Sequence, residues 1–423
     1  MTRHVTPRLI AYAAVTAGGM LAAVVLAAPE LVATVVPFAV VLVLGVAAPR
    51  PREITVSFHT APARAVEGDE VEVEVVVRTA VDVARLEVAL VVAEGLEAVG
   101  SASVATAAIG GQPETLTFTM RAIRWGVFRP ERATVRAGAA AGLVTWKGEF
   151  GTRRPLEVHP GTERLRRLLR PAHMQPFTGT HVSRARGEGI EFADVRPFVA
   201  GDRVRSVNWR ATARRGELWI NDRHPERNTD VVVFVDTFAD VGPPGAGTLD
   251  RAVRAAAAVA ARHLAAADRV GLVGFGGVVR SVPAGMGVAQ LRAIAAALLS
   301  SAVVFTWADK SLDILPPRSL PPRALVVALT PLIDPRSVAT LADLRARGFD
   351  IAIVECGVPE AAADPSDMTA TLARRIWNIE REAARDGFRR SGVPVVTWPE
   401  DQPLEAALEE MDRLRRAPRP VGR

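Results

Sequence analysis

The chain opens with two uninterrupted apolar runs. Residues 9–28 and 31–48 carry no charge, and each is long enough to span a bilayer as a helix. Two residues separate them, which predicts a tight transmembrane hairpin within residues 1–52. Arginines flank the pair, so the positive-inside bias predicts a multi-pass protein of the cell membrane whose later domains lie in the cytoplasm. The alternative is a cleaved signal peptide that ends near Ala28.

An alternating pattern replaces the apolar runs over residues 53–160. Within residues 69–78, valines alternate with glutamates, as in a strand with one buried face. Further short strands, glycine turns and the lack of a helical period predict a small antiparallel sandwich of immunoglobulin-like type. The region holds no catalytic combination of side chains, so we expect a scaffold or spacer.

From residue 229 to residue 423, apolar strands such as TDVVVFVDT and RALVVALT alternate with helical stretches. Strands of this kind are typical of a parallel sheet that is buried on both faces. The sequence therefore predicts an α/β fold with a doubly wound, mostly parallel sheet. Ligands of such sheets bind at the carboxyl ends of the strands, which directs attention to Asp236.

Asp236 begins the sequence DTFAD at the end of the first of these strands. An Asp in this place, followed by a hairpinned second and third strand, resembles the von Willebrand factor A domain. That family holds a divalent cation through the oxygen atoms of a D-x-S-x-S motif. Asp236 fits the motif, whereas Phe238 and Asp240 replace its serines, and Thr306 and Asp334 are candidates for the remaining ligands. The resemblance implies either a degenerate A-like domain without a cofactor or an adhesion-type module that binds Mg²⁺.

Between the two patterned regions, residues 161–228 form a basic linker and a patterned segment. The linker at 161–186 is expected to be a solvated connector, although such runs also suit anionic lipid or nucleic acid. The segment RGEGIEFADVRPFVAGDRVRSVNWRATARRGEL at 186–218 is too charged for a core element. It resembles the DUF58 family, whose members join a membrane hairpin and a β-rich middle to an A-like domain. The matching signature residues are Gly187, Gly189, Glu191, Phe192, Arg196, Gly201, Asp202, Arg205, Asn208, Trp209 and Arg214.

The residue types of this segment suggest a network of arginines and carboxylates. Asp202 can hold Arg205 or Arg214 in a fork-shaped pair, and Glu191 can hold Arg196 or Arg214. Because an unpaired buried arginine is costly, each is expected to have its acid. We expect the network to clamp the segment onto the A-like domain, with Trp209 as an apolar plate. The alternative is that these side chains face outward and bind a partner.

Composition narrows the function classes. The net charge of +6 comes almost entirely from arginine that is spread along the chain, since Lys147 and Lys310 are the only lysines, so nucleic acid is not an expected partner. The one cysteine, Cys356, lies in an apolar run and is expected to be a buried small side chain. The sequence has neither a P-loop motif nor a nucleophile beside a histidine. A hydrolase remains an alternative, because one group of acids and a histidine could form a catalytic cluster: Glu191, Asp194, Asp202, Asp222 and His224.

These patterns predict a non-enzymatic, membrane-anchored interaction protein. The resemblance to DUF58 implies a MoxR-type AAA+ ATPase as the partner, and assembly or chaperone-like work at the bacterial cell envelope. The hairpin adds contact with membrane lipid. Neither the client protein nor the oligomeric state follows from the sequence.

Overall fold

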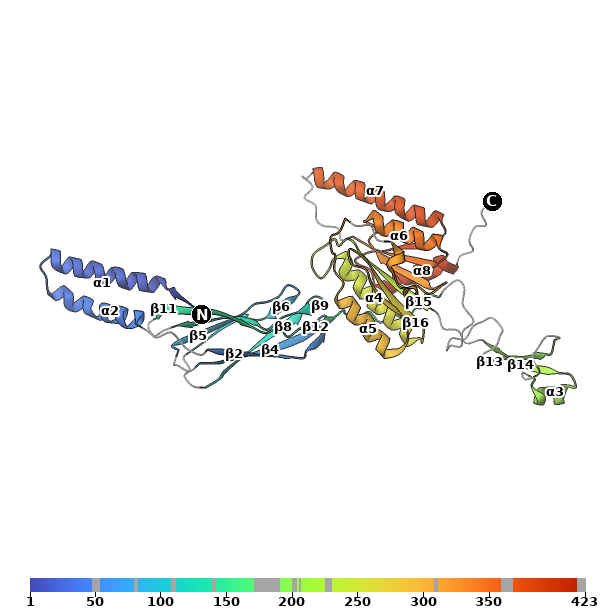
Figure 1. Cartoon of the computed structure of the whole chain (residues 1–423), viewed down its shortest axis with the longest axis horizontal. Helices are drawn as coiled ribbons and strands as arrows, with labels where there is room; N and C mark the ends of the chain where they lie inside the picture. Colours follow the sequence, from blue (N-terminus) through green and yellow to red (C-terminus); the bar gives the residue numbers. More distant parts are fainter. Residues whose placement is uncertain are drawn as a thin grey trace. The chain divides into compact units, whose positions relative to one another are not determined.

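The chain divides into two compact units, residues 1–159 and 160–423. The predicted hairpin and sandwich ranges fall in the first unit, and the signature segment and α/β range fall in the second (Figure 1). The structure is a computed structural model. It describes residues 1–47, 54–79, 83–107, 112–138, 142–170, 191–199, 204, 207–224, 230–307, 311–358 and 368–416.

Two apolar helices, α1 (Pro7–Val25) and α2 (Glu30–Val46), belong to the first unit. Among the described helices, α1 is the one that is long and apolar enough to cross a membrane, which fits a membrane anchor or a signal sequence. The apolar helix α2 has 17 residues and contains Pro37. The structure therefore gives one candidate span, where the sequence predicted two.

A short strand that the patterns did not predict precedes α1. This strand, β1 (Thr2–Val5), pairs antiparallel with β11 (Val144–Gly151). The Arg3 guanidinium donates to the carbonyl of Val46 at the end of α2 (2.9 Å). The buried side chains around Trp146 pack against both helices. The start of α1 and the end of α2 are thus held together at one end of the β structure.

Two antiparallel sheets with a shared apolar core form most of the first unit. The five-stranded sheet has the order β1-β11-β10-β5-β7, the four-stranded sheet has the order β2-β4-β8-β6, and a small third sheet has the order β3-β12-β9. In β4 (Glu70–Arg78) alternate valines are buried, which confirms the predicted alternation. The other strands are β2 (Thr55–Ala61), β3 (Arg64–Val66), β5 (Arg85–Leu90), β6 (Leu96–Val99), β7 (Ser103–Ala107), β8 (Glu114–Ala122), β9 (Gly126–Phe128), β10 (Arg132–Gly138) and β12 (Leu156–His159).

The second unit contains a six-stranded sheet of order β17-β16-β15-β18-β19-β20. Strand β17 runs antiparallel to its neighbour and the other pairs are parallel, which confirms the predicted mostly parallel α/β sheet. The strands are β15 (Asp230–Thr237), β16 (Arg269–Gly276), β17 (Arg280–Gly285), β18 (Leu325–Thr330), β19 (Asp350–Cys356) and β20 (Val395–Trp398).

Helices cover both faces of this sheet, with α6 and α7 on the opposite side from α4 and α5 (Figure 1). Val232 and Phe234 of β15 share a core with Leu341 of α6 and Phe388 of α7. The small side chains of α4 are buried against the sheet. The helices are α4 (Thr248–Ala265), α5 (Gly287–Leu299), α6 (Pro335–Ala346), α7 (Met368–Arg390), α8 (Leu404–Arg416) and the short 3₁₀ turns Leu312–Ile314 and Pro317–Ser319.

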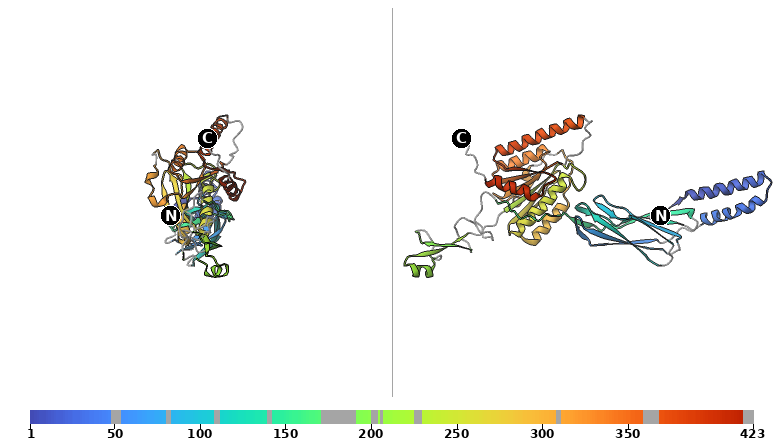
Figure 2. Two further views of the ribbon diagram at one scale, coloured as in Figure 1. Left: turned by 90° about the vertical axis from the view of Figure 1, so that its right-hand side faces the viewer. Right: turned by 180° about the vertical axis from the view of Figure 1, so that it is seen from behind.

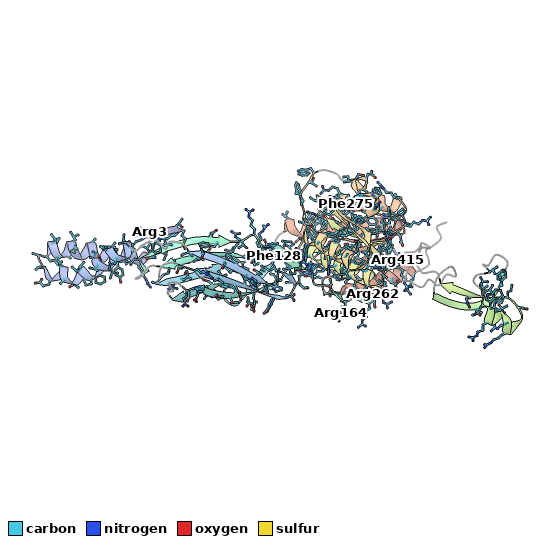
Figure 3. All side chains as sticks on the ribbon, turned by 60° about the horizontal axis from the view of Figure 1, so that its bottom comes forward. Arg3, Phe128, Arg164, Arg262, Phe275 and Arg415 are labelled. Atoms are coloured by element: carbon cyan, nitrogen blue, oxygen red, sulfur yellow. The ribbon has the colours of Figure 1, made fainter. Side chains whose placement is uncertain are left out.

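Residues 161–170 pack on the α/β domain, so the prediction of a solvated connector is wrong for this stretch. Two consecutive backbone N–H groups of the stretch donate to the Glu405 carboxylate on α8 (3.0 and 3.1 Å). Arg262 of α4 and Arg415 of α8 donate to its backbone carbonyls (Figure 3). These arginines satisfy backbone groups of the protein itself. The rest of the basic linker, 171–186, lies outside the described residues.

Candidate functional site at the carboxyl edge of the sheet

Polar side chains gather where the parallel strands of the second unit end. Asp236 of β15, Thr330 of β18 and Glu355 of β19 each lie within the last two residues of their strand. Thr330 and Glu355 are directly paired in the sheet register. Because ligands of parallel sheets bind at this edge, we treat it as the candidate site and call it the carboxyl edge.

Asp236 is buried at this edge, and neutral donors contact its carboxylate. Its Oδ1 accepts the backbone N–H of Phe238 (3.0 Å), and its Oδ2 accepts the hydroxyl of Thr330 (2.7 Å). Burial raises the pKa of Asp236 to about 6, although these hydrogen bonds act in the opposite direction. Thr330, which the sequence patterns did not single out, therefore supplies the hydroxyl that faces this acid.

Two of the positions expected to ligate a cation, Asp334 and Thr306, contact the guanidinium of Arg336. Its Nε and Nη2 donate to the two carboxylate oxygens of Asp334 (2.9 and 2.8 Å), and its Nη1 donates to the carbonyl of Thr306 (2.7 Å). Its carbon atom Cζ lies 4.4 Å from the centre of the Phe238 ring, in cation–π geometry. The hydrogen bonds from Arg336 are the main cause of the lowered pKa of Asp334. An internal cation thus contacts three of the positions taken from the A-domain pattern.

Asp240, the second acid of the expected metal site, caps helix α4. Its Oδ1 accepts the N–H of Leu249 (2.9 Å) and the hydroxyl of Thr248 (3.2 Å), as suits an acid at a helix N-terminus. A Cβ at Gly247 would lie 2.5 Å from Asp240 Oδ1, so a larger residue there would displace the capping carboxylate. Asp236 and Asp240 therefore use their oxygens for different partners.

These contacts do not fit a divalent cation. Mg²⁺ needs several oxygen ligands in near-octahedral geometry, whereas Phe238 offers a ring and Asp334 is already paired with Arg336. Within the described part of the chain, no three His, Cys, Asp or Glu side chains lie close enough together to hold a metal ion. The side chains present favour the alternative in which this edge works without a metal.

A second buried acid, Glu355, lies two strands away and is paired with arginines. Arg385 Nη1 donates to both of its carboxylate oxygens (3.0 and 3.2 Å), Arg381 also pairs with it, and Thr397 donates its hydroxyl (2.7 Å). Arg381 further donates to the carbonyl of Pro331 (3.1 Å). The sequence reasoning missed this cluster. The available signal was an acid inside the apolar run FDIAIVEC together with two arginines four residues apart in a later helix.

A groove of about 770 Å³ opens beside the Glu355 cluster. It lies between α7 and the segments that follow β19 and β20, and its lining includes Trp377, Arg381 and Arg385. Glu400 and Asp401 line it as well, so it carries both signs of charge. The groove is large enough for a few side chains of another molecule, but its mixed charge selects no ligand class.

The described part of the signature segment forms a small module of β13 (Glu191–Pro197), α3 (Trp209–Arg215) and β14 (Trp219–His224). Asn208 caps α3, because its Oδ1 accepts the N–H of Ala211 (3.0 Å). Its Nδ2 donates to the side chain of Asn221 in β14 (2.6 Å). Asn208 thus joins the helix to the strand, and Asn221 is a partner that the sequence did not reveal.

The aromatic and charged side chains of this module differ from the expected clamp. Trp209, expected as an apolar plate, is 65% exposed. Trp219 is partly buried instead, and the Arg215 guanidinium lies 3.9 Å from its ring centre. Arg214 is exposed, and Arg196 donates to the carbonyl of Pro197 (3.1 Å). The remaining signature positions lie outside the described residues: Gly187, Gly189, Gly201, Asp202, Arg205 and the side chains of Glu191 and Phe192. The arginine–carboxylate network therefore stays a prediction.

The residues considered for hydrolysis receive no support as a catalytic set. The register of β13 and β14 places Glu191 opposite His224 and Asp194 opposite Asp222, but these side chains lie outside the described part. Cys356 is fully buried, and burial raises the pKa of its thiol to about 12. A thiol of this kind is not ionised near neutral pH and does not act as a nucleophile.

An exposed aromatic pair lies beside the carboxyl edge, on the loop that follows α5. Phe305 is 75% exposed and Trp307 is 88% exposed, and their rings meet edge to face with centroids 4.9 Å apart. The backbone that carries them is anchored. A Cβ at Gly277, just after β16, would lie 1.7 Å from the carbonyl oxygen of Val304, so the close approach requires a glycine. Arg336 holds the carbonyl of the residue between the two rings.

Solved structures share limited similarity with this chain. One is α-2-macroglobulin from Escherichia coli (22% identity, 27% of this chain, 18% of that chain, TM-score 0.21). Another is the complex of zinc 2-glycoprotein and prolactin inducible protein from human seminal plasma (11% identity, 25% of this chain, 97% of that chain, TM-score 0.17). A third is β-glucosidase from Listeria innocua (18% identity, 26% of this chain, 16% of that chain, TM-score 0.15). TM-scores of this size carry no argument about the fold.

Sequence comparison is more informative. "Uncharacterized protein YeaD" of Bacillus subtilis (strain 168) is 22% identical over 125 residues, which cover 30% of this chain and 31% of that protein. The chain thus aligns with less than a third of the length of this relative. The family described as "Protein of unknown function DUF58" matches residues 194–368, a range that includes Asp236 and Arg336. Over these residues, the chain matches the model of the DUF58 family.

Proposed function

We propose that this protein is a membrane-anchored docking protein that binds another protein at the carboxyl edge. The observation that carries the proposal is the exposure of Phe305 and Trp307 beside that edge. Large aromatic side chains supply most of the binding energy at many interfaces. Because Gly277 and Arg336 hold the loop backbone, little ordering has to occur on binding.

The expected partner is a MoxR-type AAA+ ATPase, the partner class that the DUF58 resemblance implies. The ATPase would supply the energy for assembly or chaperone-like work at the cell envelope. The strand order β17-β16-β15-β18-β19-β20, with one antiparallel strand, supports a von Willebrand factor A-like docking module. The contacts of Asp236 and Arg336 support docking that needs no metal.

The anchor is proposed to be a two-span hairpin with both ends in the cytoplasm. The contact from Arg3 to Val46 and the pairing of β1 with β11 bring the two flanks of the hairpin together. At about 1.5 Å per residue, the 17 residues of α2 are at the lower limit for a span. Cleavage near Ala28 would remove β1, a strand paired within the β structure, which argues against a signal peptide.

We propose no catalytic role. Both buried acids of the carboxyl edge already have partners, because Asp236 accepts hydrogen bonds from Phe238 and Thr330 and Glu355 pairs with two arginines. A general acid or base needs a proton path to a substrate, and neither carboxylate is exposed. The immunoglobulin-like sandwich is proposed to serve as a spacer between the membrane and the docking module.

Capture of the ATPase tests the proposal. Full-length protein in detergent is immobilised and incubated with the MoxR-type ATPase of the same organism, with and without ATP. We expect capture by the wild type and a loss of affinity of about tenfold or more in Phe305→Ala/Trp307→Ala, because hot-spot residues contribute about 2 kcal/mol or more. Leu414→Ala, an exposed apolar position on α8, is the matched control and should bind like the wild type.

Two results would count against the proposal, each in a different way. Unchanged capture by the double aromatic variant would remove the carboxyl edge as the docking surface. No capture by the wild type would remove the MoxR-type ATPase as the partner class.

A further inference from the structure

Helix α7 presents an apolar stripe to solvent. Met368, Leu372, Ile376 and Ile379 are 79%, 58%, 47% and 60% exposed. With Ala383, which is also exposed, they fall within an arc of about 80° at 100° per residue. In Figure 1, and in the view from behind in Figure 2, α7 is the outermost helix on its side of the sheet. A continuous apolar stripe of this length on an outer helix is typical of a contact surface.

The opposite side of α7 is held to the domain largely by charge. Arg381 and Arg385 pair with the buried Glu355, and Arg381 also donates to the backbone beyond β18. Phe388 joins the core near the end of the helix. The helix therefore turns its ionic side inward and its apolar stripe outward, which is the reverse of an ordinary surface helix.

The charges that border the stripe suit a second α7 helix in antiparallel orientation. Arg375 and Glu382 are exposed, lie seven residues apart and border the stripe on the same side. In an antiparallel pair centred between residues 377 and 378, Leu372 meets the partner's Ala383, and Ile376 meets the partner's Ile379. Arg375 then lies near Glu382 of the second copy. Because the pair is twofold symmetric, the same ion pair forms a second time with the two copies exchanged.

We propose that α7 is a self-association surface through which two copies of this chain pair antiparallel. Glu380 and Glu382 flank the stripe on its two sides, which disfavours binding to an anionic lipid surface. One helix pair is smaller than a standard interface of about 1,600 Å², so the dimer is expected to be reversible and concentration-dependent. The inference does not rest on the proposed function, since it concerns α7 and not the aromatic loop.

Charge reversal tests the pairing. The oligomeric state of the full chain in detergent is measured by analytical ultracentrifugation over a range of concentrations. We expect a monomer–dimer equilibrium whose dissociation constant rises about tenfold or more in Ile376→Asp and by a smaller factor in Arg375→Glu or Glu382→Arg alone. The double variant Arg375→Glu/Glu382→Arg should recover wild-type association. Leu414→Asp, on an exposed face of α8, is the control for the added charge and should dimerise normally.

Cross-linking tests the orientation independently. Leu372→Cys and Ala383→Cys proteins with different tags are mixed and oxidised, with Cys356 buried and out of reach. The antiparallel register predicts disulfides between the two different variants. It also predicts none between two Leu372→Cys copies, because those positions would be about 16 Å apart along the axis.

Three outcomes would overturn the inference. They are a monomer at all concentrations, a charge-swapped double variant no better than the single ones, and disulfides between two Leu372→Cys copies in place of the mixed ones. Loss of ATPase capture with dimerisation intact would instead concern only the proposed function.

Discussion

Asp236 and Glu355 lie at the same edge of one sheet, and both are buried, yet their surroundings differ. Asp236 accepts hydrogen bonds from a backbone N–H and a threonine hydroxyl, and burial raises its pKa to about 6. Glu355 is paired with Arg381 and Arg385, which come from α7. A buried carboxylate must be stabilised either by paired cations or by hydrogen bonds from neutral groups. Glu355 has paired cations, and Asp236 has hydrogen bonds from neutral groups.

The two acids differ in whether a guanidinium is directed at them. Arg336 directs its guanidinium to the more exposed Asp334 and to the loop carbonyl of Thr306. Among the described residues, the hydrogen-bond donors to the Asp236 carboxylate, Phe238 and Thr330, are uncharged. At Glu355, by contrast, the charge pairs hold α7 against the sheet and turn its apolar stripe outward.

The largest effect is expected at Glu355. Glu355→Ala leaves Arg381 and Arg385 without their buried partner, which should destabilise the α/β domain by about 3–5 kcal/mol. Urea unfolding of the full chain in detergent measures the loss. Asp386→Ala, which removes an exposed pair with Arg389 on the same helix, is the control and should cost less than about 1 kcal/mol. Equal effects of the two variants would mean that the Glu355 cluster is no stronger than a surface pair.

A pH-dependent effect is expected at Asp236. Its pKa of about 6 in the folded state exceeds the unfolded value near 3.9, so the folded state binds more protons between these values. This contribution to stability is present in full below pH 4 and is lost as pH rises through 6, by about 3 kcal/mol in total.

The variant Asp236→Asn cannot ionise at this position. Comparison with the wild type therefore isolates the contribution of Asp236 ionisation to the free energy of unfolding. The unfolding free energy of the variant should lack this pH dependence, and at pH 7.5 it should equal or exceed that of the wild type. Unfolding midpoints at pH 4.5, 6 and 7.5 provide the measurement. If wild type and variant change in parallel over this range, Asp236 is ionised in both states and the contrast with Glu355 fails.

The smallest effect is expected from divalent cations. Because Arg336, Phe238 and the cap at Asp240 occupy the groups of the expected metal site, Mg²⁺ or Mn²⁺ should shift the thermal unfolding midpoint by less than about 1 °C relative to EDTA. A rise of several degrees that disappears in Asp236→Ala would show that a metal is the charge partner of Asp236. It would also restore the adhesion-type alternative.

Patterns of neighbouring residues predicted a large part of the fold. The alternation in β4, the apolar strands of the six-stranded sheet and the long apolar helix α1 follow from local periodicity and hydropathy. Strand β1 escaped prediction because four polar and apolar residues before a helix carry no periodic signal. Residues 161–170 were misjudged since their backbone is satisfied by Glu405, which is far away in the sequence.

The sequence by itself determined the sheet, the position of Asp236 at a strand end and the match to the DUF58 family model, because these depend on residues close together in the chain. The tertiary structure alone decided which groups meet: Thr330 with Asp236, Arg336 with Asp334 and Thr306, and two arginines of α7 with Glu355. Such contacts join segments up to 94 residues apart, and no local pattern specifies which of many arginines or hydroxyls reaches a given buried acid. Burial then sets the charge state of that acid, because desolvation must be offset by whatever partner the fold provides.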